Sequence, residues 1–274
     1  MIRTGSPADL PALRSLFALA NDAPYDLAVV AEEKCFGPGV AGEPLLRVVE
    51  EGGRIVAASV SCGRHLRLLI VDRPSRRHGL GSALLADAEG RGVAIIAAEA
   101  GNYFTPGIVT TDDDAGAFFH ARDYVETLWT WNLEVELEGH AAPPGIIRPA
   151  HADATRVLEF VEHEFGRIWR FEAAKAFDSE LPAAFVAEDE GQITGFAVHD
   201  VNNRGLGFFG PTGVMESMRG RGIGGSLLLA SLEDLRRMGY GKAVIPWTDA
   251  LEFYRKCCGA LPAHRFAAFA KSLR

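Results

Sequence analysis

The sequence contains the same succession of landmarks twice, roughly 140 residues apart. A Gly-rich segment at 76–81, RRHGLG, is matched at 219–224 by RGRGIG. An aromatic pair at 118–119, FF, is matched at 253–254 by FY, and short Ile-Arg segments open both halves. Because two unrelated halves would not keep this order, the repeat predicts two copies of one fold.

The segment between the copies, 138–145, reads EGHAAPPG. Its Gly and Pro-Pro residues resist both helix and sheet, so it is expected to be a linker. The predicted domains are therefore residues 1–140 and residues 145–274, a division that agrees with typical domain sizes.

Within each copy, hydrophobic patterning predicts strands, then a Gly-rich turn into a helix, then a further strand and helix. This order indicates an α/β fold. In the first copy the predicted strands are 45–50, 55–62, 66–71, 93–98 and 128–137, and the helix after the turn is 79–90. In the second copy the predicted strands are 183–188, 193–201, 207–214 and 243–246, and the helices are 222–239 and 250–258.

Composition excludes several classes of protein. The 274 residues include 48% hydrophobic and 23% charged residues, and the formal net charge is -8. The hydrophobic fraction is too high for a disordered chain, and a net acidic chain argues against nucleic acid as a partner. No apolar run approaches the roughly 20 residues that a membrane span requires. A globular protein with no nucleic-acid or membrane partner is expected.

The cysteines and the N-terminal segment indicate a cytoplasmic protein. The four cysteines are too few and too scattered for a disulfide framework, and they form no CxxC pair that would suggest a metal site; they are Cys35, Cys62, Cys257 and Cys258. The opening residues, MIRTGSPADLPAL, lack the apolar core of a signal peptide. We expect a reduced, cytoplasmic setting and no metal.

The strand-to-helix turn of each copy contains the residues that suggest a ligand-binding site. Each copy has the form Val-x-x-x-x-Arg-x-x-Gly-x-Gly, beginning at Val71 and at Val214. Glycines let the backbone turn sharply and approach a ligand closely. The first amides of the following helix have no intrahelical partner and lie at the positive end of the helix dipole. With the arginines of each turn, they predict a site for a phosphate or diphosphate.

A dinucleotide fold is an alternative for the second turn, because residues 220–225, GRGIGG, match GxGxxG. This match is weak. Residues 215–218 separate the glycines from the preceding strand, and the first copy lacks the third glycine.

The doubled Arg-x-x-Gly-x-Gly turn and the stretch ALEFYRKCCGA at 250–260 resemble the GNAT superfamily of N-acetyltransferases. The order of elements resembles that family over essentially the whole chain. The resemblance implies two tandem GNAT-like domains, each a mixed, mostly antiparallel twisted sheet flanked by helices. It also implies acetyl-CoA as co-substrate, with no metal.

Carried over from the family, the diphosphate of acetyl-CoA would lie at each Gly-rich turn and its pantetheine would pair with the preceding strand. In the second copy the implied coenzyme-binding residues are Val214, Arg219, Gly220, Arg221, Gly222, Ile223, Gly224, Gly225 and Ser226. In the first copy they are Val71, Arg76, Arg77, His78, Gly79, Leu80, Gly81 and Ser82.

Family members usually transfer the acetyl group directly to an amine. Tyr254 matches the tyrosine that often protonates the departing thiolate, and a phenol suits that role. The first copy has Phe119 at this place, which cannot donate a proton. We therefore predict that the C-terminal domain is catalytic and that the N-terminal domain has a binding or scaffolding role.

The general base is not identified. His199, Asp200, Asp249 or a bound water are candidates. Trp247 stands where the family often has an asparagine that contacts the coenzyme, so one coenzyme contact is in doubt. Cys257 and Cys258 are expected to pack rather than to act as nucleophiles.

The predicted function is N-acetyl transfer from acetyl-CoA to a primary amine of a small molecule. The alternative is a non-catalytic protein that binds acyl-CoA and has a regulatory role. The identity of the acceptor and the formation of a homo-oligomer are left open by the sequence.

Overall fold

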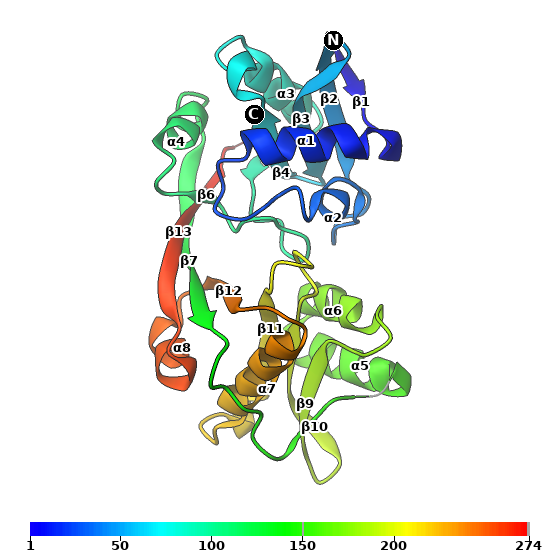
Figure 1. Cartoon of the computed structure of the whole chain (residues 1–274), viewed down its shortest axis with the longest axis vertical. Coiled ribbons are helices and arrows are strands. Elements are labelled where there is room, and N and C mark those ends of the chain that lie inside the picture. Colours follow the sequence, from blue (N-terminus) through cyan, green and yellow to red (C-terminus); the bar gives the residue numbers. More distant parts are fainter. Residues whose placement is uncertain (150, 273–274) are drawn as a thin grey trace. The chain divides into compact units, whose positions relative to one another are not determined.

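The computed structural model describes residues 1–149 and 151–272. The chain divides into two compact units, and each is described here by itself (Figure 1). The first unit comprises residues 1–130 together with the chain from residue 264 onward, and the second comprises residues 131–263.

The first unit is built on a twisted, mostly antiparallel sheet. Its strands are β1 (Ile2–Thr4), β2 (Leu45–Glu51), β3 (Arg54–Cys62), β4 (His65–Val71), β5 (Ile95–Ile96) and the end of β13 (Leu261–Ala270). Strands β1 to β4 pair antiparallel, whereas β4 and β5 pair parallel at His65–Ile95 and Leu66–Ile96. The short β6 (Ile108–Val109) also pairs with β13.

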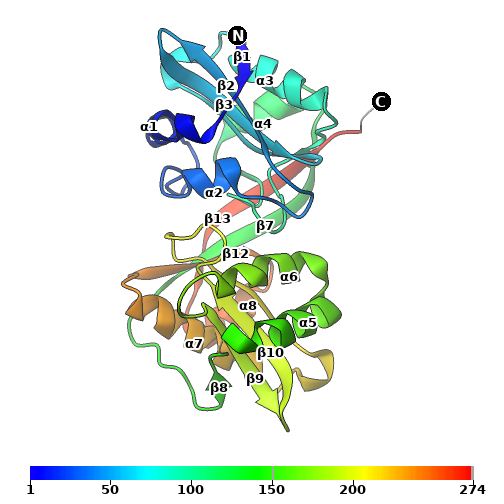
Figure 2. The same ribbon diagram turned by 90° about the vertical axis from the view of Figure 1, so that its right-hand side faces the viewer.

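Helices cover both faces of this sheet (Figure 2). Helices α1 (Leu10–Ala20) and α2 (Ala31–Phe36) lie on one face, and α3 (Leu80–Glu89) lies on the other. The buried residues of α1, Leu13, Leu16, Phe17 and Ala20, have the spacing of a single helical stripe. Helix α4 (Asp113–His120) follows β6 and leads into β7 (Val125–Glu136).

The second unit repeats this plan. An antiparallel sheet has the order β11-β10-β9-β8, from strands β8 (Ile146–Ile147), β9 (Ala184–Asp189), β10 (Gln192–His199) and β11 (Phe209–Val214). The end of β7 pairs antiparallel with β12 (Lys242–Thr248), and a parallel bridge joins Phe208 to Val244.

Helices pack on both faces of the second unit's sheet as well. The leucines of α7 (Ile223–Arg237) pack on Ala197 and Phe209, whereas α5 (Ala154–Phe165) packs on Phe196 and Val198. Helix α6 (Arg167–Ala174) follows α5, and α8 (Leu251–Cys258) precedes β13.

Each predicted strand and helix is present, with ends that shift by a few residues. The α/β class and the mixed, mostly antiparallel sheets are confirmed, and such sheets differ from the parallel sheet of a dinucleotide fold. The strand β13 and the helices α2 and α6 were not predicted. The predicted domains, 1–140 and 145–274, follow the repeats of the sequence, whereas the compact units do not: the end of β13 pairs with β5 and β6 in the first unit.

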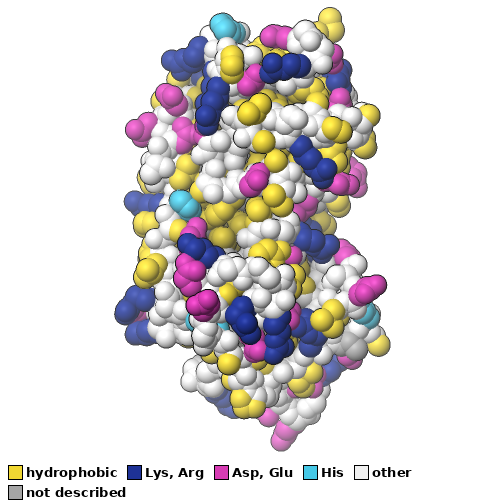
Figure 3. Space-filling view, in the orientation of Figure 1, with side chains coloured by type: hydrophobic (Ala, Val, Ile, Leu, Met, Phe, Trp, Pro, Cys, Tyr) yellow, Lys and Arg dark blue, Asp and Glu magenta, His cyan; other side chains and the backbone are white. Residues whose placement is uncertain are grey.

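On the face shown in Figure 3, basic and acidic side chains are interspersed. Within residues 1–149 and 151–272, the helices all fall short of the length and apolar character needed to cross a bilayer.

Candidate functional site

The two Gly-rich turns have nearly the same backbone geometry. A short 3-10 turn leads in each unit to an extended arginine, Arg76 with φ −66° and ψ 157° and Arg219 with φ −65° and ψ 157°. The glycine before each helix is left-handed, with φ of 84° at Gly79 and 81° at Gly222. A side chain in this region is strained, which explains the two glycines. The repeat of the sequence is thus reproduced in individual torsion angles.

The arginine of each turn ties the turn to the preceding strand. Nε of Arg76 donates to the carbonyl of Val71 (3.1 Å), and Nε of Arg219 donates to that of Val214 (3.2 Å). Arg76 also donates to the last carbonyl of α1 (2.9 Å) and to Asp22 (2.6 Å). These arginines therefore shape the turn, in addition to the phosphate contact predicted for them.

Backbone amides are available at the start of α3 and of α7. The first helical hydrogen bonds run from the amide of Ala83 to Gly79 (2.9 Å) and from that of Ser226 to Gly222 (3.0 Å). Among the described residues, the amides of 80–82 and of 223–225 have no backbone acceptor. Three free amides at the positive end of a helix dipole suit a phosphate.

A cavity of about 730 Å³ lies against the turn of the first unit. This volume is in the range of small-molecule sites. The predicted coenzyme-binding residues that line it are Val71, Arg76, Arg77, Gly79, Leu80, Gly81 and Ser82; His78 is exposed outside it. The loop after β5 also lines the cavity, through Phe104, Thr105 and Gly107.

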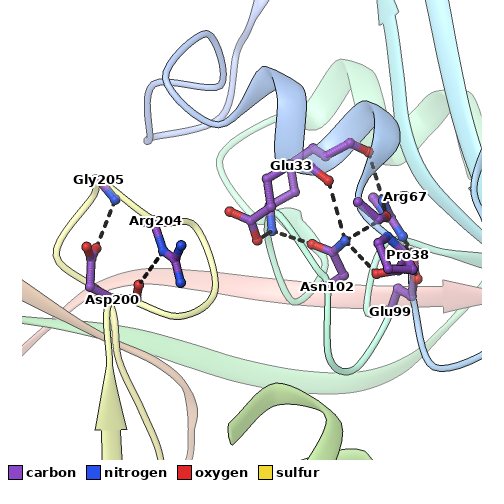
Figure 4. A network of polar contacts seen from close by, with 10 residues as sticks. Glu33, Pro38, Arg67, Glu99, Asn102, Asp200, Arg204 and Gly205 are labelled. Atoms are coloured by element: carbon purple, nitrogen blue, oxygen red, sulfur yellow. Dashed lines mark hydrogen bonds and ion pairs between the residues drawn. The ribbon is translucent and has the colours of Figure 1, made fainter. Parts of the chain in front are cut away.

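A buried ionic pair lies beside this cavity in the first unit (Figure 4). Arg67, on β4 and in the cavity wall, makes a bidentate pair with Glu99 through Nε (2.7 Å) and Nη2 (2.8 Å). Its Nη1 donates to the carbonyl of Gly37 (2.9 Å), and Asn102 donates to that of Pro38 (2.9 Å). Arg67 therefore neutralises Glu99 and also holds the loop after α2 through the Gly37 carbonyl.

The second unit arranges its predicted residues in the same way. A Cβ placed on Gly224 would lie 3.6 Å from Val214 and from Phe253, and one placed on Gly81 would lie 3.6 Å from Phe118. Residues 219–222 are exposed and residues 223–226 are half-buried, so the turn faces solvent. Ser82 carries one of the free amides, whereas Ser226 lies one position later and its amide closes the first helical bond.

The aromatic residues after these phenylalanines differ between the units. Tyr254 is 9% exposed and packs against Phe209, with ring centres 6.4 Å apart. Burial, with a smaller effect of Cys258 and Cys257, raises the pKa of Tyr254 to about 12. Its hydroxyl therefore carries its proton at neutral pH. Phe119 takes the same place in the first unit and is also buried.

Two of the candidate general bases have structural partners. His199 is buried, and its Nε2 bonds Asp234 at 2.8 Å. Burial would raise the pKa of Asp234, but hydrogen bonds with His199 and Arg148 hold it at about 2. The carboxylate of Asp200 accepts from the amide of Gly205 (2.9 Å) and fixes the turn after β10.

Asp249 is exposed just before α8, and it stays a candidate base. Trp247 has a positive φ of 50°, and its amide donates to Asn132 Oδ1 at 3.0 Å. Burial raises the pKa of the thiols of Cys257 and Cys258, so both are protonated at neutral pH. This protonation agrees with packing and not with nucleophilic work.

Some residues near the turns escaped the sequence prediction. Asp22 accepts hydrogen bonds from Arg73 (2.9 Å) and Arg76, although it lies in a segment without any pattern. Phe165 packs closely on Gly213, where a Cβ would lie 2.5 Å from its ring. Arg122 bonds Ser82 across forty residues of sequence. Such contacts join distant segments, and no local signal could reveal them.

Comparison with known proteins identifies the fold of the chain and a family domain in its C-terminal part. Residues 151–260 match the model of the acetyltransferase (GNAT) family. No curated protein sequence matches the chain.

Solved structures with this fold cover almost the whole chain. A GCN5-related glucosamine N-acetyltransferase region of a fungal multi-domain GH3 β-N-acetylglucosaminidase matches 99% of the chain with TM-score 0.81 and 16% identity; the chain spans 38% of that protein. A GCN5-related N-acetyltransferase from Sphaerobacter thermophilus matches 99% of the chain and 95% of its own length, with TM-score 0.71 and 22% identity.

A third structure bears on the repeat itself. A tandem GNAT protein from the clavulanic acid biosynthesis pathway matches 99% of the chain and 98% of its own length, with TM-score 0.68 and 19% identity. The N-terminal region, which the family model does not reach, shares this fold. Residues 151–260 therefore form a domain that matches the acetyltransferase (GNAT) family, and the whole chain has the fold of tandem GNAT proteins.

Proposed function

We propose that the C-terminal unit transfers an acetyl group from acetyl-CoA directly to a primary amine of a small molecule. The proposal depends on one difference between the two units. Both have the same Gly-rich turn, but at the equivalent position on the later helix the second unit has the phenol of Tyr254. The first unit has Phe119 there and can bind without supplying this proton.

The coenzyme would be held by backbone groups in the second unit. The free amides of 223–225 and the N-terminal end of α7 would bind its diphosphate, and Val214 would lie beside its pantetheine. Gly220 and Gly222, both with φ of 81°, let the backbone approach the ligand without a Cβ in the way. Arg219 and Arg221, both exposed, add positive charge there.

Direct transfer requires a group that accepts a proton from the amine and a group that donates a proton to the thiolate. The amine nitrogen, after losing a proton to the base, forms a bond to the acetyl carbon, and the bond from that carbon to sulfur breaks. Tyr254 would donate its proton to the departing thiolate and regain one from solvent. Its raised pKa keeps that proton in place until the thiolate forms.

The first unit would bind acyl-CoA or serve as a scaffold. Its cavity of about 730 Å³ is lined by the predicted coenzyme-binding residues of the first turn, apart from His78. Binding there without turnover would leave one stably bound coenzyme in each chain.

An amino sugar is the first acceptor to test. The fungal neighbour is described as a glucosamine N-acetyltransferase region, and glucosamine is a small primary amine. At 16% identity that likeness concerns the fold, so glucosamine belongs in a panel with polyamines, amino acids and aromatic amines.

The test measures release of free thiol from acetyl-CoA in the presence of each amine. An enzyme releases thiol in proportion to acetylated amine. A non-catalytic acyl-CoA-binding protein, the competing possibility, would give heat of binding with acetyl-CoA but would release no thiol with any amine. That second outcome would overturn the proposal.

A further inference from the structure

Arg122 places a guanidinium beside the turn of the first unit. Its Nη2 donates to Ser82 Oγ (2.6 Å), and its Nη1 donates to the carbonyl of Phe118 (2.7 Å). The guanidinium carbon also lies 3.8 Å from the centre of the Phe118 ring. These contacts fix the charge beside Ser82, whose amide is one of the free amides of α3, and Arg122 lines the 730 Å³ cavity.

The charge of Arg122 differs from those of the other arginines fixed in the cavity wall. Arg67 is paired with Glu99 and Arg76 with Asp22. Over residues 1–149 and 151–272, Arg122 has no carboxylate within 4.0 Å and bonds through its side chain only to a hydroxyl and a carbonyl.

Arg122 also keeps donors for a ligand. A guanidinium has five N–H donors, and these two bonds use two of them. The acids that line the cavity are Asp22, Asp112 and Asp114, and Asp112 is engaged as the cap of α4, where it accepts from the amide of Ala115 (2.9 Å).

The second unit has no such charge. Cys257 follows Tyr254 by three residues, as Arg122 follows Phe119. Its Sγ lies 3.4 Å from a Cβ placed on Gly225, which holds the position of Ser82. The thiol is neutral because burial raises its pKa. The two turns therefore share a backbone, but the first has a guanidinium held beside Ser82 where the second has the thiol of Cys257 near Gly225.

We propose that Arg122 binds the diphosphate of coenzyme A at the turn of the first unit. A guanidinium matches the geometry of phosphate oxygens, and its hydrogen bonds to them are strengthened by charge. The inference rests on the proposed function, because it requires that the first turn binds the same coenzyme as the second.

The experiment isolates the first site in the full-length chain. Gly224→Val is designed to close the second turn: a Cβ there already lies 3.6 Å from Val214 and Phe253, so the valine methyls crowd the start of α7. Unfolding curves check that the chain stays folded, and loss of one coenzyme site by calorimetry checks that the turn is closed. In this background, calorimetry compares coenzyme A binding before and after Arg122→Ala. We expect a 10- to 100-fold loss of affinity, the size of one charged hydrogen-bonding contact.

Three ligands separate phosphate binding from packing. Dephospho-coenzyme A keeps the diphosphate and should show the same loss. Pantetheine has no phosphate, so Arg122→Ala should leave its competition with coenzyme A unchanged. Arg122→Lys, which keeps the charge, should restore part of the affinity. An equal loss for pantetheine would mean that Arg122 only packs the site, and a loss confined to coenzyme A would assign it to the 3′-phosphate; either result overturns the proposal.

The reciprocal variant tests the same idea in the second unit. In a chain whose first turn is closed by Gly81→Val, Cys257→Arg should tighten coenzyme A binding several-fold. If the Gly224→Val chain binds coenzyme A and Arg122→Ala leaves this affinity unchanged, the inference about Arg122 is wrong and the proposed function still stands. If neither single-site chain binds coenzyme A, the proposed function fails with it.

Discussion

The two Gly-rich turns of this protein share their backbone and differ in the side chains around it. The arginine torsions agree within 1°, and the glycines before α3 and α7 agree within 3°. Around this shared frame the first unit has Phe119 and Arg122, whereas the second has Tyr254 and Cys257. Under the proposed function, the shared backbone would bind a diphosphate in both units, and these neighbouring side chains would distinguish a unit that holds the coenzyme from one that uses it.

The largest expected effect is on turnover. Tyr254→Phe should lower kcat by about 100-fold or more, because general acid catalysis commonly contributes that much, while the affinity for acetyl-CoA changes little. Thiol release measures kcat, and calorimetry measures binding. Tyr124→Phe removes a buried hydroxyl from the first unit and serves as the matched control, with turnover unchanged. Unchanged turnover in the Tyr254 variant would remove this residue from the mechanism.

The pH dependence of kcat should show the raised pKa of Tyr254. An acid keeps its proton below its pKa, so raising that pKa to about 12 extends the active plateau upward. At pH 11 an unshifted phenol with pKa about 10 would retain roughly a tenth of its protonated form, whereas this one would retain most of it. A decline of kcat centred at pH 10, while the chain stays folded by circular dichroism, would contradict the role assigned to burial.

The shared backbone predicts equal sensitivity at the two left-handed glycines. Gly79→Ala and Gly222→Ala should each destabilise the chain by about 1 kcal/mol or somewhat more, a drop of roughly 2–4 °C in the unfolding midpoint. Gly81→Ala is the control, since Gly81 has no positive φ and its Cβ would meet neighbours only at 3.6 Å. Clearly unequal losses of unfolding free energy at Gly79 and Gly222 would show that the two turns differ in energy despite their similar torsion angles.

The smallest effect concerns the arginines that tie down the turns. Arg76 bonds Val71, the end of α1 and Asp22, whereas the side-chain bond described for Arg219 is to Val214 alone. Arg76→Ala should therefore destabilise the chain more than Arg219→Ala, by about 1 kcal/mol. Urea unfolding measures the difference, with the exposed Arg221→Ala as the neutral control. A greater loss for Arg219→Ala would reverse this ranking.

Much of the fold could be predicted because its signals are local. The strands and helices of both copies follow from hydrophobic period, and the turns follow from glycines that must adopt positive φ. The equivalence of Tyr254 and Phe119 was visible because the repeat sets the two halves in register. Short segments without pattern, such as α2 and α6, gave no comparable signal.

The sequence by itself determined that this chain is a doubled fold with a Gly-rich strand-to-helix turn of the same form in each copy. The repeat and the glycine positions depend only on neighbouring residues. Tertiary structure decided what meets those turns: β13 beside β5 and β6, Asp22 against Arg76, and Arg122 against Ser82. These contacts join segments that are about 40 or more residues apart, and their partners are chosen by packing of the whole unit, which no local pattern records.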